Sequence, residues 1–487
     1  MSNCARFSTI MITADEIKQK SKETAIQTSD IQRDYLFGWL LFYLFTKSKF
    51  KEILFLKGGN ALRKAYFVNT RFSGDLDFGT PHDLDLEELK QELTAACAFI
   101  NEQTEITFVI ERNDVVEKFG KWKETRWKVF EAKIYFKDFF GKSDHITLKI
   151  SLDITRFDKH YLPIQTVPLI HPYSDSDSIA CNIRCMKLEE VLATKLKCML
   201  QREHAPDLFD LIFSIYMNQN IPIDKSEVRR VFLQRTIFEN NPSVVKNILL
   251  KLPLEYLKAT WTKALICTQD IFFDAEDAVK RFTEQITEMF QDVTDNPWSD
   301  HYYFGADHRN AILKAGREMT LLRVTYNGAV RMVEPYALKF QERSDGVAKE
   351  YFYVYDRTGS KNNPDWKTFV AENLSAIENT DEKFEPQFEV ELCRAGEHPE
   401  DRYLYDREKK QQKEYARVMR NSTRFGSSSV QTRKPRAYAF GPKYVFKCSV
   451  CGKQFTRKTY NASLGQHKSK SGGYPCYGYG IYVTTRY

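Results

Sequence analysis

The spacing of apolar and polar residues changes along the chain. Over Leu188–Tyr216 and residues 217–300, apolar residues recur every three or four positions, which predicts helices. Between residues 321 and 392 short runs alternate apolar and polar positions, and the Asn-Gly pair at Asn327 predicts a hairpin turn. Residues 13–47 predict two helices, the second of them apolar. The pattern therefore predicts separate helical and β-rich parts.

A short apolar run, Ile53–Leu56, leads into the pair Gly58 and Gly59 and then into an amphipathic segment. This order predicts a strand, a tight turn and a short helix, whose free backbone N–H groups can cradle phosphates. A second short strand carries Asp75 and Asp77, two residues apart and so on one face. Two carboxylates on one face suit a divalent metal better than a core.

The next segments predict a helix over Asp85–Glu102 and strands over Glu105–Glu111, Trp127–Phe136 and His145–Thr155. Asp153 stands among apolar neighbours in the last strand. An acid in that setting is costly unless it is paired, hydrogen-bonded or metal-bound. The alternative is an Asp that caps a turn at the strand end.

A Gly-Gly turn or an Asp-x-Asp pair alone is common, but the two together are a much more specific sign of a functional site. Residues 30–215 resemble the nucleotidyltransferase-fold family of AbiEii/AbiGii toxins, in which Gly-Gly-x-x-Leu-x-Lys-x-Tyr precedes Arg-x-Ser-x-Asp-Leu-Asp-Phe. Asn60 stands where a small hydroxyl residue is usual, and Asn can also hold a turn. The matching residues are Gly58, Gly59, Leu62, Lys64, Tyr66, Arg71, Ser73, Asp75, Leu76, Asp77 and Phe78.

The helical segment after Leu188 reads by itself as a charged amphipathic helix pair. It also resembles the Glu, Lys, Arg and Asp-x-x-Asp-Leu pattern of the same family, with Pro206 in place of the Arg that usually precedes the first Asp. The matching residues are Glu190, Lys195, Arg202, Asp207 and Asp210.

The resemblance implies transfer of a nucleotide from an NTP to an acceptor, with RNA such as a tRNA 3′ end favoured. It also implies one or two Mg²⁺ ions held by Asp75, Asp77 and Asp153, and growth arrest or phage defence with a partner antitoxin. The implied catalytic residues are Asp75, Asp77, Asp153, Lys195 and Asp210, and the implied nucleotide-binding residues are Gly58, Gly59, Lys64, Ser73 and Lys195.

Two other classes of function stay open. In the first, the enzyme nucleotidylates a protein or a small molecule. In the second, the protein is a nucleotide-binding regulator that acts through a WYL-like module and a zinc module, both described below. Intact carboxylates and an intact Gly-Gly turn argue against an inactive enzyme.

The β-rich part, residues 318–392, resembles a WYL domain, a small β-barrel of bacterial regulators that sense ligands or nucleic acid. A generic β module that supports the core is the alternative. The expected strands are Leu321–Tyr326, Arg331–Tyr336, Glu350–Asp356, Phe369–Ile377, Thr380–Phe384 and Phe388–Leu392.

Charge is distributed unevenly. The 487 residues carry a formal charge of +7, with 72 Lys and Arg against 65 Asp and Glu. Residues 402–487 hold 19 basic and 3 acidic residues, a net of +16, which leaves −9 for residues 1–401. A basic tail favours contact with nucleic acid, although a charge run is often only a solvated face.

Ten cysteines without an N-terminal secretory pattern predict a reducing, cytoplasmic setting rather than a disulfide framework. The longest apolar run, Tyr35–Phe45, is shorter than the roughly 20 residues of a membrane span, so we expect a buried helix and no membrane contact. Near the C-terminus, a Cys-x-x-Cys pair with a later His and Cys predicts a structural Zn²⁺ site, against the alternative of a free pair. The predicted ligands are Cys448, Cys451, His467 and Cys476.

Together these observations predict an α+β multidomain protein: a nucleotidyltransferase-fold mixed sheet with a helical bundle, then a small β-barrel and a zinc-binding module. With roughly 100–200 residues per domain, the length allows for several domains. The expected parts are a catalytic domain (1–165), a helical domain that completes the active site (166–300), a WYL-like domain (301–395), a basic linker (396–440) and a zinc module (441–487).

Overall fold

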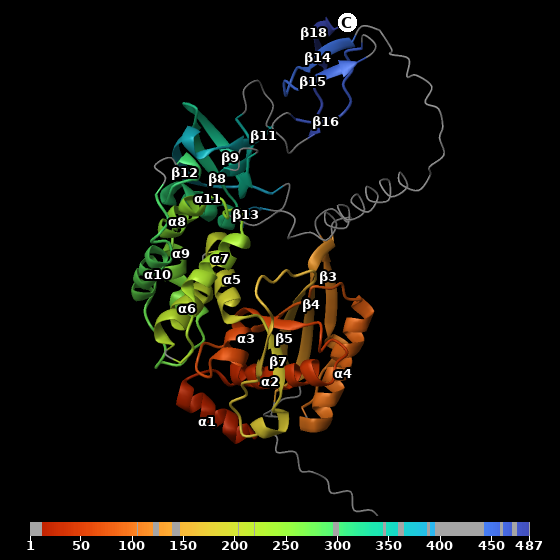
Figure 1. Cartoon of the computed structure of the whole chain (residues 1–487), viewed down its shortest axis with the longest axis vertical. Coiled ribbons are helices and arrows are strands. Elements are labelled where there is room, and N and C mark those ends of the chain that lie inside the picture. The colour runs from red at the N-terminus through yellow and green to blue at the C-terminus, as the bar shows by residue number, and fades with distance from the viewer. Residues whose placement is uncertain are drawn as a thin grey trace, which may run out of the picture. The chain divides into compact units, whose positions relative to one another are not determined.

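The computed structural model describes residues 12–486 except for 105, 120–125, 139–146, 203, 219, 296–300, 344–346, 359–364, 387–389, 395–442, 458–460 and 470–474. The chain forms two compact units, Met1–Lys413 and Glu414–Tyr487 (Figure 1). None of the helices found in the described ranges is long and apolar enough to cross a membrane. The predicted basic linker, 396–440, lies outside the described residues.

A seven-stranded mixed sheet forms the framework of the N-terminal part of the first unit. Its strand order is β3-β4-β5-β2-β1-β7-β6. The β2–β5 and β1–β7 pairs are parallel and the other pairs are antiparallel, which confirms the predicted mixed sheet. The strands are β1 (Phe55–Lys57), β2 (Asp75–Gly79), β3 (Asp114–Phe119), β4 (Arg126–Lys137), β5 (Thr147–Thr155), β6 (Gln165–Pro168) and β7 (Asn182–Cys185).

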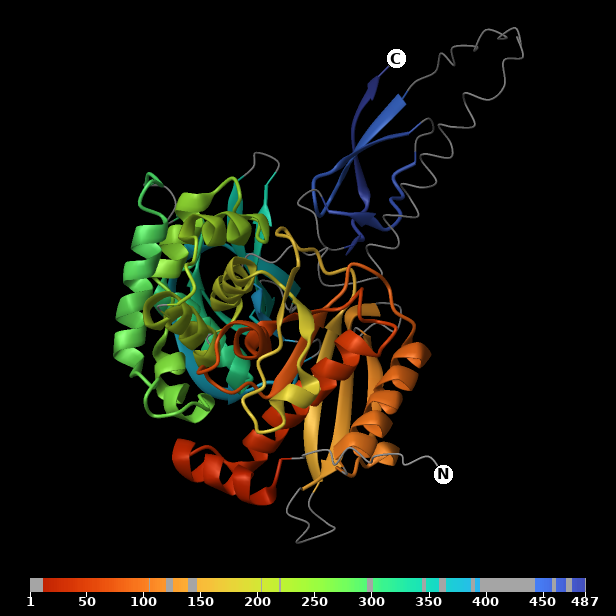
Figure 2. The same ribbon diagram turned by 60° about the horizontal axis from the view of Figure 1, so that its bottom comes forward.

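Two long helices pack on one face of this sheet (Figure 2). α2 (Thr28–Thr46) contacts β5 and β7, and α4 (Leu86–Thr104) contacts β3 and α2. Most of α2 is buried, as predicted for its apolar run. The remaining helical elements of this part are α1 (Ala14–Thr24), α3 (Gly58–Ala61), the π-helical turn η1 (Leu62–Tyr66), and the 3-10 turns η2 (Ile110–Arg112) and η3 (Ser176–Ile179).

A helical segment follows the sheet and shares its core. One cluster of buried apolar side chains extends from Ile12 through the sheet and these helices, so the parts predicted as 1–165 and 166–300 fold around a common interior. Phe209 stacks on Phe273 with ring centroids 4.9 Å apart. The elements are α5 (Leu188–Gln201), α6 (Ala205–Ile212), the π-helical turn η4 (Phe213–Met217), α7 (Lys225–Gln234), α8 (Pro242–Leu250), α9 (Glu255–Ala264) and α10 (Ala275–Met289).

A second sheet of order β11-β10-β9-β8-β12, with β13 beside β9, ends the described part of the first unit. The predicted hairpin is confirmed, since Asn327 and Gly328 both have positive φ, at 51° and 73°. Among the described strands, β11 and β12 are the two edges of this sheet and do not pair with each other. Closure of the sheet into a barrel therefore stays a prediction. The elements are α11 (Ala306–Glu318), β8 (Thr320–Tyr326), β9 (Ala329–Glu342), β10 (Ala348–Asp356), β11 (Asp365–Phe369), the 3-10 turn η6 (Ala371–Asn373), β12 (Leu374–Lys383) and β13 (Glu391–Arg394).

Two strand predictions are wrong, and a third, Thr380–Phe384, is the end of β12 (Leu374–Lys383) rather than a separate strand. Glu105–Glu111 alternates like a strand, but among its described residues only Phe108 forms a bridge, to Phe136, before the 3-10 turn η2. Phe369–Ile377 is not one strand, because η6 separates β11 from β12. In both places a turn within the run breaks the ladder, although the apolar alternation continues.

The described part of the second unit contains two small sheets. Three antiparallel strands have the order β15-β14-β18, and two short strands, β16 and β17, pair with each other. Their bounds are β14 (Lys443–Cys448), β15 (Gln454–Arg457), β16 (His467–Lys468), β17 (Pro475–Cys476) and β18 (Gly480–Arg486).

Candidate functional site

The chain turns sharply where β1 meets α3. Gly58 has φ of +71°, a conformation that favours glycine. A Cβ at this position would lie 2.0 Å from Asp77 Oδ2, so the backbone passes directly against that carboxylate. A Cβ at Gly59 would lie 2.8 Å from both Ser73 Oγ and Arg71 Nη2. The predicted strand, turn and helix are confirmed, and both glycines are required because polar side chains pack against the turn.

The two acids of β2 alternate with buried residues. Leu76 and Phe78 are fully buried, whereas Asp75 and Asp77 are partly exposed on the other face. β2 runs parallel to β5, and the register sets Asp77 opposite Asp153. Because paired residues of neighbouring strands project to the same side, the three predicted carboxylates share one face of the sheet.

Negative charge is crowded on this face. Burial raises the pKa of Asp77, Asp75 and Asp153 raise it further, and Lys57 and Lys195 act in the opposite direction, which leaves it at about 6. Like-charged carboxylates held together in this way are stabilised by a divalent cation. The residues present therefore fit a bound Mg²⁺ ion.

The three carboxylates form an open arrangement. Among the described residues, the ligand atoms of only one group of three or more His, Cys, Asp or Glu residues all lie within 4.8 Å of one another. That group consists of cysteines and a histidine in the second unit, so the three carboxylates lie further apart. The acids of β2 and β5 thus provide a shared face rather than a closed cage. Such a face suits Mg²⁺, which keeps several water or substrate phosphate ligands.

A buried network of charges lies between α5 and α6. Lys195 Nζ lies 2.9 Å from Asp207 Oδ1 and 2.9 Å from Asp210 Oδ2. Arg71 donates to both oxygens of Asp210 at 2.7 Å, and Arg202 donates to Asp207 at 2.8 Å. Burial alone would lower the pKa of Lys195, but Asp207 and Asp210 outweigh it and raise the pKa, so the ammonium group stays charged.

Two side chains connect the turn to β2. Ser73 Oγ donates to Asp75 Oδ1 at 3.2 Å. Asn60 Nδ2 donates to the backbone carbonyl of Asp75, so Asn at this position does hold the turn as expected. Both contacts place the turn beside the carboxylates.

Lys64 occupies a different setting from the predicted one. Its Nζ lies 3.0 Å from Asp34 Oδ1 and donates to the Asp34 carbonyl at 2.8 Å, and its side chain is fully buried. Burial lowers the pKa of Lys64 to about 8 even though Asp34 favours the charged form. A fully buried ammonium group cannot contact a nucleotide without leaving Asp34. The structure therefore gives Lys64 a structural role in place of phosphate binding.

Asp34 receives further buried partners. Arg63 Nε donates to its Oδ1 at 2.7 Å, and the Tyr173 hydroxyl donates to Oδ2 at 2.8 Å. Burial alone would raise the pKa of Asp34, but Arg63 and Lys64 outweigh it and hold the pKa well below its usual range. This ion cluster anchors η1, which follows the Gly-Gly turn, to α2.

Sequence reasoning assigned no role to two cations near the carboxylates, Lys57 and Arg71. Lys57 Nζ donates to Asp158 Oδ2 at 2.6 Å and to Thr155 Oγ1 at 2.9 Å, and it lowers the pKa of Asp77. Arg71 holds Asp210, as described above. A signal existed for both, since Lys57 directly precedes the turn and Arg71 belongs to the family pattern, whereas no pattern marked Asp158.

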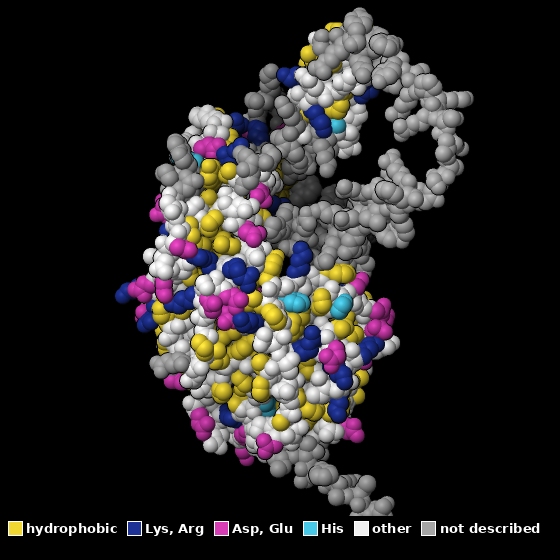
Figure 3. Space-filling view, in the orientation of Figure 1, with side chains coloured by type: hydrophobic (Ala, Val, Ile, Leu, Met, Phe, Trp, Pro, Cys, Tyr) yellow, Lys and Arg dark blue, Asp and Glu magenta, His cyan; other side chains and the backbone are white. Residues whose placement is uncertain are grey.

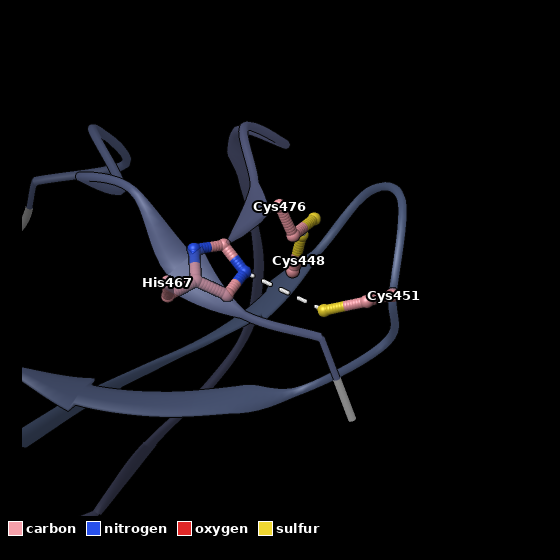
Figure 4. Close-up of side chains that lie close together, drawn as sticks. All are labelled: Cys448, Cys451, His467 and Cys476. Carbon is pink, nitrogen blue, oxygen red and sulfur yellow. Dashed lines mark hydrogen bonds between the residues drawn. The ribbon is translucent and has the colours of Figure 1, made fainter. Parts of the chain in front are cut away.

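The predicted zinc ligands meet in the second unit (Figure 4). One ligand atom from each of the four residues lies within 4.8 Å of all the others. Cys448 Sγ lies 3.5 Å from Cys476 Sγ, and Cys451 Sγ lies 3.4 Å from His467 Nε2. The spacing seen in the sequence thus corresponds to one cluster in space. Three thiols and one imidazole are a donor set that fits Zn²⁺.

The surroundings of this cluster also suit a metal. His467 Nδ1 lies 2.9 Å from the Gly465 carbonyl, which leaves Nε2 on the side of the thiols. Gly452, directly after the Cys-x-x-Cys turn, has φ of +70°. A Cβ at Gly478 would lie 2.4 Å from Cys448 Sγ, so only glycine allows the chain to pass there.

A separate cavity of about 640 Å³ lies between α4 and β3. Its lining includes Leu86, Lys90, Ile110 and Val116, and none of the carboxylates or cations described above. The charged face of β2 and β5 is therefore not part of this cavity.

A mixed sheet with a Gly-Gly turn against paired carboxylates is the arrangement of a nucleotidyltransferase fold. The chain belongs to the family described as nucleotidyl transferase AbiEii toxin, type IV toxin–antitoxin system, which matches residues 39–300. It is thus a nucleotidyltransferase of the toxin class, and membership implies a cognate antitoxin.

Two further comparisons add context. A solved structure of MenT4, a nucleotidyltransferase toxin from Mycobacterium tuberculosis H37Rv, is 19% identical with a TM-score of 0.40, over 57% of this chain and 90% of its own. No match was found among curated proteins.

Proposed function

We propose that this toxin transfers a nucleotide from an NTP to RNA, with a tRNA 3′ end as the favoured acceptor, in a Mg²⁺-dependent reaction. The observation that carries the proposal is the face on which Asp75, Asp77 and Asp153 lie together, with the Gly58 backbone directly against Asp77. Acids and an open turn side by side suit a nucleoside triphosphate with its cation.

Each part of the site has a task in this reaction. Asp75, Asp77 and Asp153 would hold the cation, which supplies activation of the acceptor oxygen and neutralisation of the leaving pyrophosphate when bound. The turn at Gly58 and the Ser73 hydroxyl would hydrogen-bond the phosphates.

The charged network of α5 and α6 supports the same reaction. Lys195 is held charged by Asp207 and Asp210, and it acts electrostatically on Asp77. Its positive charge would therefore also act on the phosphates of a bound NTP. Asp210, fixed by Arg71, is a positioning residue that keeps Lys195 in place.

The second unit supports RNA as the acceptor. Residues 441–487 contain no Asp or Glu but eight basic residues. Neutralisation of phosphates by Lys and Arg gives affinity for any RNA sequence. The eight are Lys443, Lys447, Lys453, Arg457, Lys458, Lys468, Lys470 and Arg486.

The test is to incubate the purified protein with Mg²⁺, each α-³²P-labelled NTP in turn, and total cellular RNA or total protein. Label in small RNA with one NTP, lost when Asp75 is replaced, is the expected result. Label in protein would replace the RNA acceptor with a protein acceptor. Nucleotide binding without any label would favour a regulator and contradict the proposal.

We expect the purified protein to contain one equivalent of zinc, and a Cys451→Ser variant to lose it, because removing one of four ligands opens a closed tetrahedral site. Metal content measured by mass spectrometry checks this. Cys181→Ser is the matched control, since Cys181 is a free, partly buried cysteine of the first unit. Wild-type protein expressed with zinc and still free of it would contradict the assignment.

A further inference from the structure

The chain that leaves the cysteine–histidine cluster alternates strictly between buried and exposed positions. Cys476, Gly478 and Gly480 are buried, whereas Tyr477 and Tyr479 are 75% and 68% exposed. The two glycines are needed on the inner side, because a Cβ at 478 would meet Cys448 Sγ and a Cβ at 480 would lie 2.9 Å from the Ala462 carbonyl. The tight inner side therefore turns both tyrosine rings outward.

These outward rings belong to a larger apolar surface. Tyr477 and Tyr479 are two positions apart in this alternation, so their rings lie on the same outer side. Ile481, two positions after Tyr479 and also exposed, continues this side along β18. We call Tyr477, Tyr479 and Ile481 the aromatic strip. Large apolar side chains exposed side by side in this way mark an interaction site.

The aromatic strip is held in place by its surroundings. The Tyr477 hydroxyl accepts from Gln466 Nε2 at 3.0 Å, and the Tyr479 carbonyl accepts from the Ser449 backbone N–H at 2.9 Å. The Tyr477 ring, ordered before binding, loses little conformational entropy when a partner arrives.

Charge decides the kind of partner. The module that carries the strip has basic residues and no acidic residue among residues 441–487. Figure 3 shows Lys and Arg side chains beside hydrophobic ones on this module. A partner must therefore offer negative charge together with flat apolar faces. Unpaired bases on a phosphate backbone combine both, since every base has a face for stacking and every phosphate a charge.

We infer that the aromatic strip binds single-stranded RNA by stacking unpaired bases on Tyr477 and Tyr479, while the surrounding lysines and arginines hold the phosphates. This inference deepens the proposed function, because it rests on RNA as the acceptor and assigns its capture to the second unit. A free 3′ end has unpaired bases, whereas a continuous duplex hides base faces within its own stack.

The experiment measures binding without any NTP, so that it does not depend on catalysis. The full-length protein is titrated against a fluorescently labelled single-stranded RNA of about 12 nucleotides and against the same strand in a duplex. Wild type is expected to bind the single strand at least about tenfold more tightly. Tyr477→Ala and Tyr479→Ala are each expected to weaken that binding about tenfold or more, since stacking contributes this much per base.

Three controls separate stacking from loss of structure. Tyr477→Phe and Tyr479→Phe keep the ring and are expected to retain binding. Zinc content shows that each variant keeps its metal cluster. Tyr256→Ala removes an exposed tyrosine of the first unit, whose ring lies under Arg317, and is expected to bind as wild type does.

Two results would overturn the inference: equal affinity for single strand and duplex, or alanine variants that retain zinc and bind like wild type. Binding that depends on the tyrosines, in a protein that labels no RNA, would leave this inference standing and remove the proposed function. If the protein transfers nucleotide to RNA but its RNA binding does not depend on the tyrosines, the proposed function stands and this inference falls.

Discussion

Asp75→Asn and Asp77→Asn variants are each expected to lose at least about a thousandfold in nucleotide transfer, because a lost metal ligand removes several kcal/mol of transition-state stabilisation. Their fold should survive. Since burial and like charge raise the pKa of Asp77, an amide there relieves repulsion and keeps or raises the thermal midpoint. The measurement is transfer of labelled nucleotide alongside thermal unfolding.

Asp177→Asn is the matched control for these variants. Asp177 is an exposed carboxylate of the same unit, in the 3-10 turn η3, and its replacement should leave transfer unchanged. A double variant of Asp75 and Asp77 that transfers nucleotide at the wild-type rate would refute the assignment of the site.

Asp34→Ala is expected to lower the free energy of unfolding by about 3–5 kcal/mol, because it leaves Arg63 and Lys64 buried without their shared carboxylate. Denaturant unfolding measures the effect. Asp15→Ala is the matched control: the Asp15 side chain is 91% exposed and pairs only at the surface with Lys18, so its loss should change stability by less than about 1 kcal/mol. Equal effects of the two replacements would refute the importance of the buried cluster.

The Asp34 carboxylate also makes the stability of the fold depend on pH in the acid range. The pKa of Asp34 in the folded protein lies below its unfolded value of about 3.9, so its contribution to stability is complete above that pH. The contribution is lost progressively as the pH falls below about 4. We therefore expect the stability difference between wild type and Asp34→Ala to shrink in acid, as measured by unfolding at a series of pH values.

Local patterns predicted much of the catalytic part. The apolar run before Gly58 and the alternation of Asp75 and Asp77 with Leu76 are signals carried by neighbouring residues. The structure confirms the strands that they predict, β1 and β2. The apolar setting of Asp153 marked it as well, and its register opposite Asp77 agrees with that prediction.

Other features depend on residues far apart in the chain, and no local pattern encodes them. The family resemblance implied that Lys64 binds the nucleotide, yet Asp34 in α2 holds it. The pairing of Arg71 with Asp210 joins residues 139 positions apart. The helix α11, directly before the β-rich part, was not predicted.

The parallel pairing of β2 with β5 has a consequence for synthesis of the toxin in the cell. A chain still on the ribosome that has emerged only through β4 carries the Gly-Gly turn and both acids of β2, but it lacks Asp153, Lys195 and Asp210. On the proposed assignment such a nascent chain is inactive. Activity on this assignment thus begins only after α6 has left the ribosome and folded, and fragments that end before α6 are inactive.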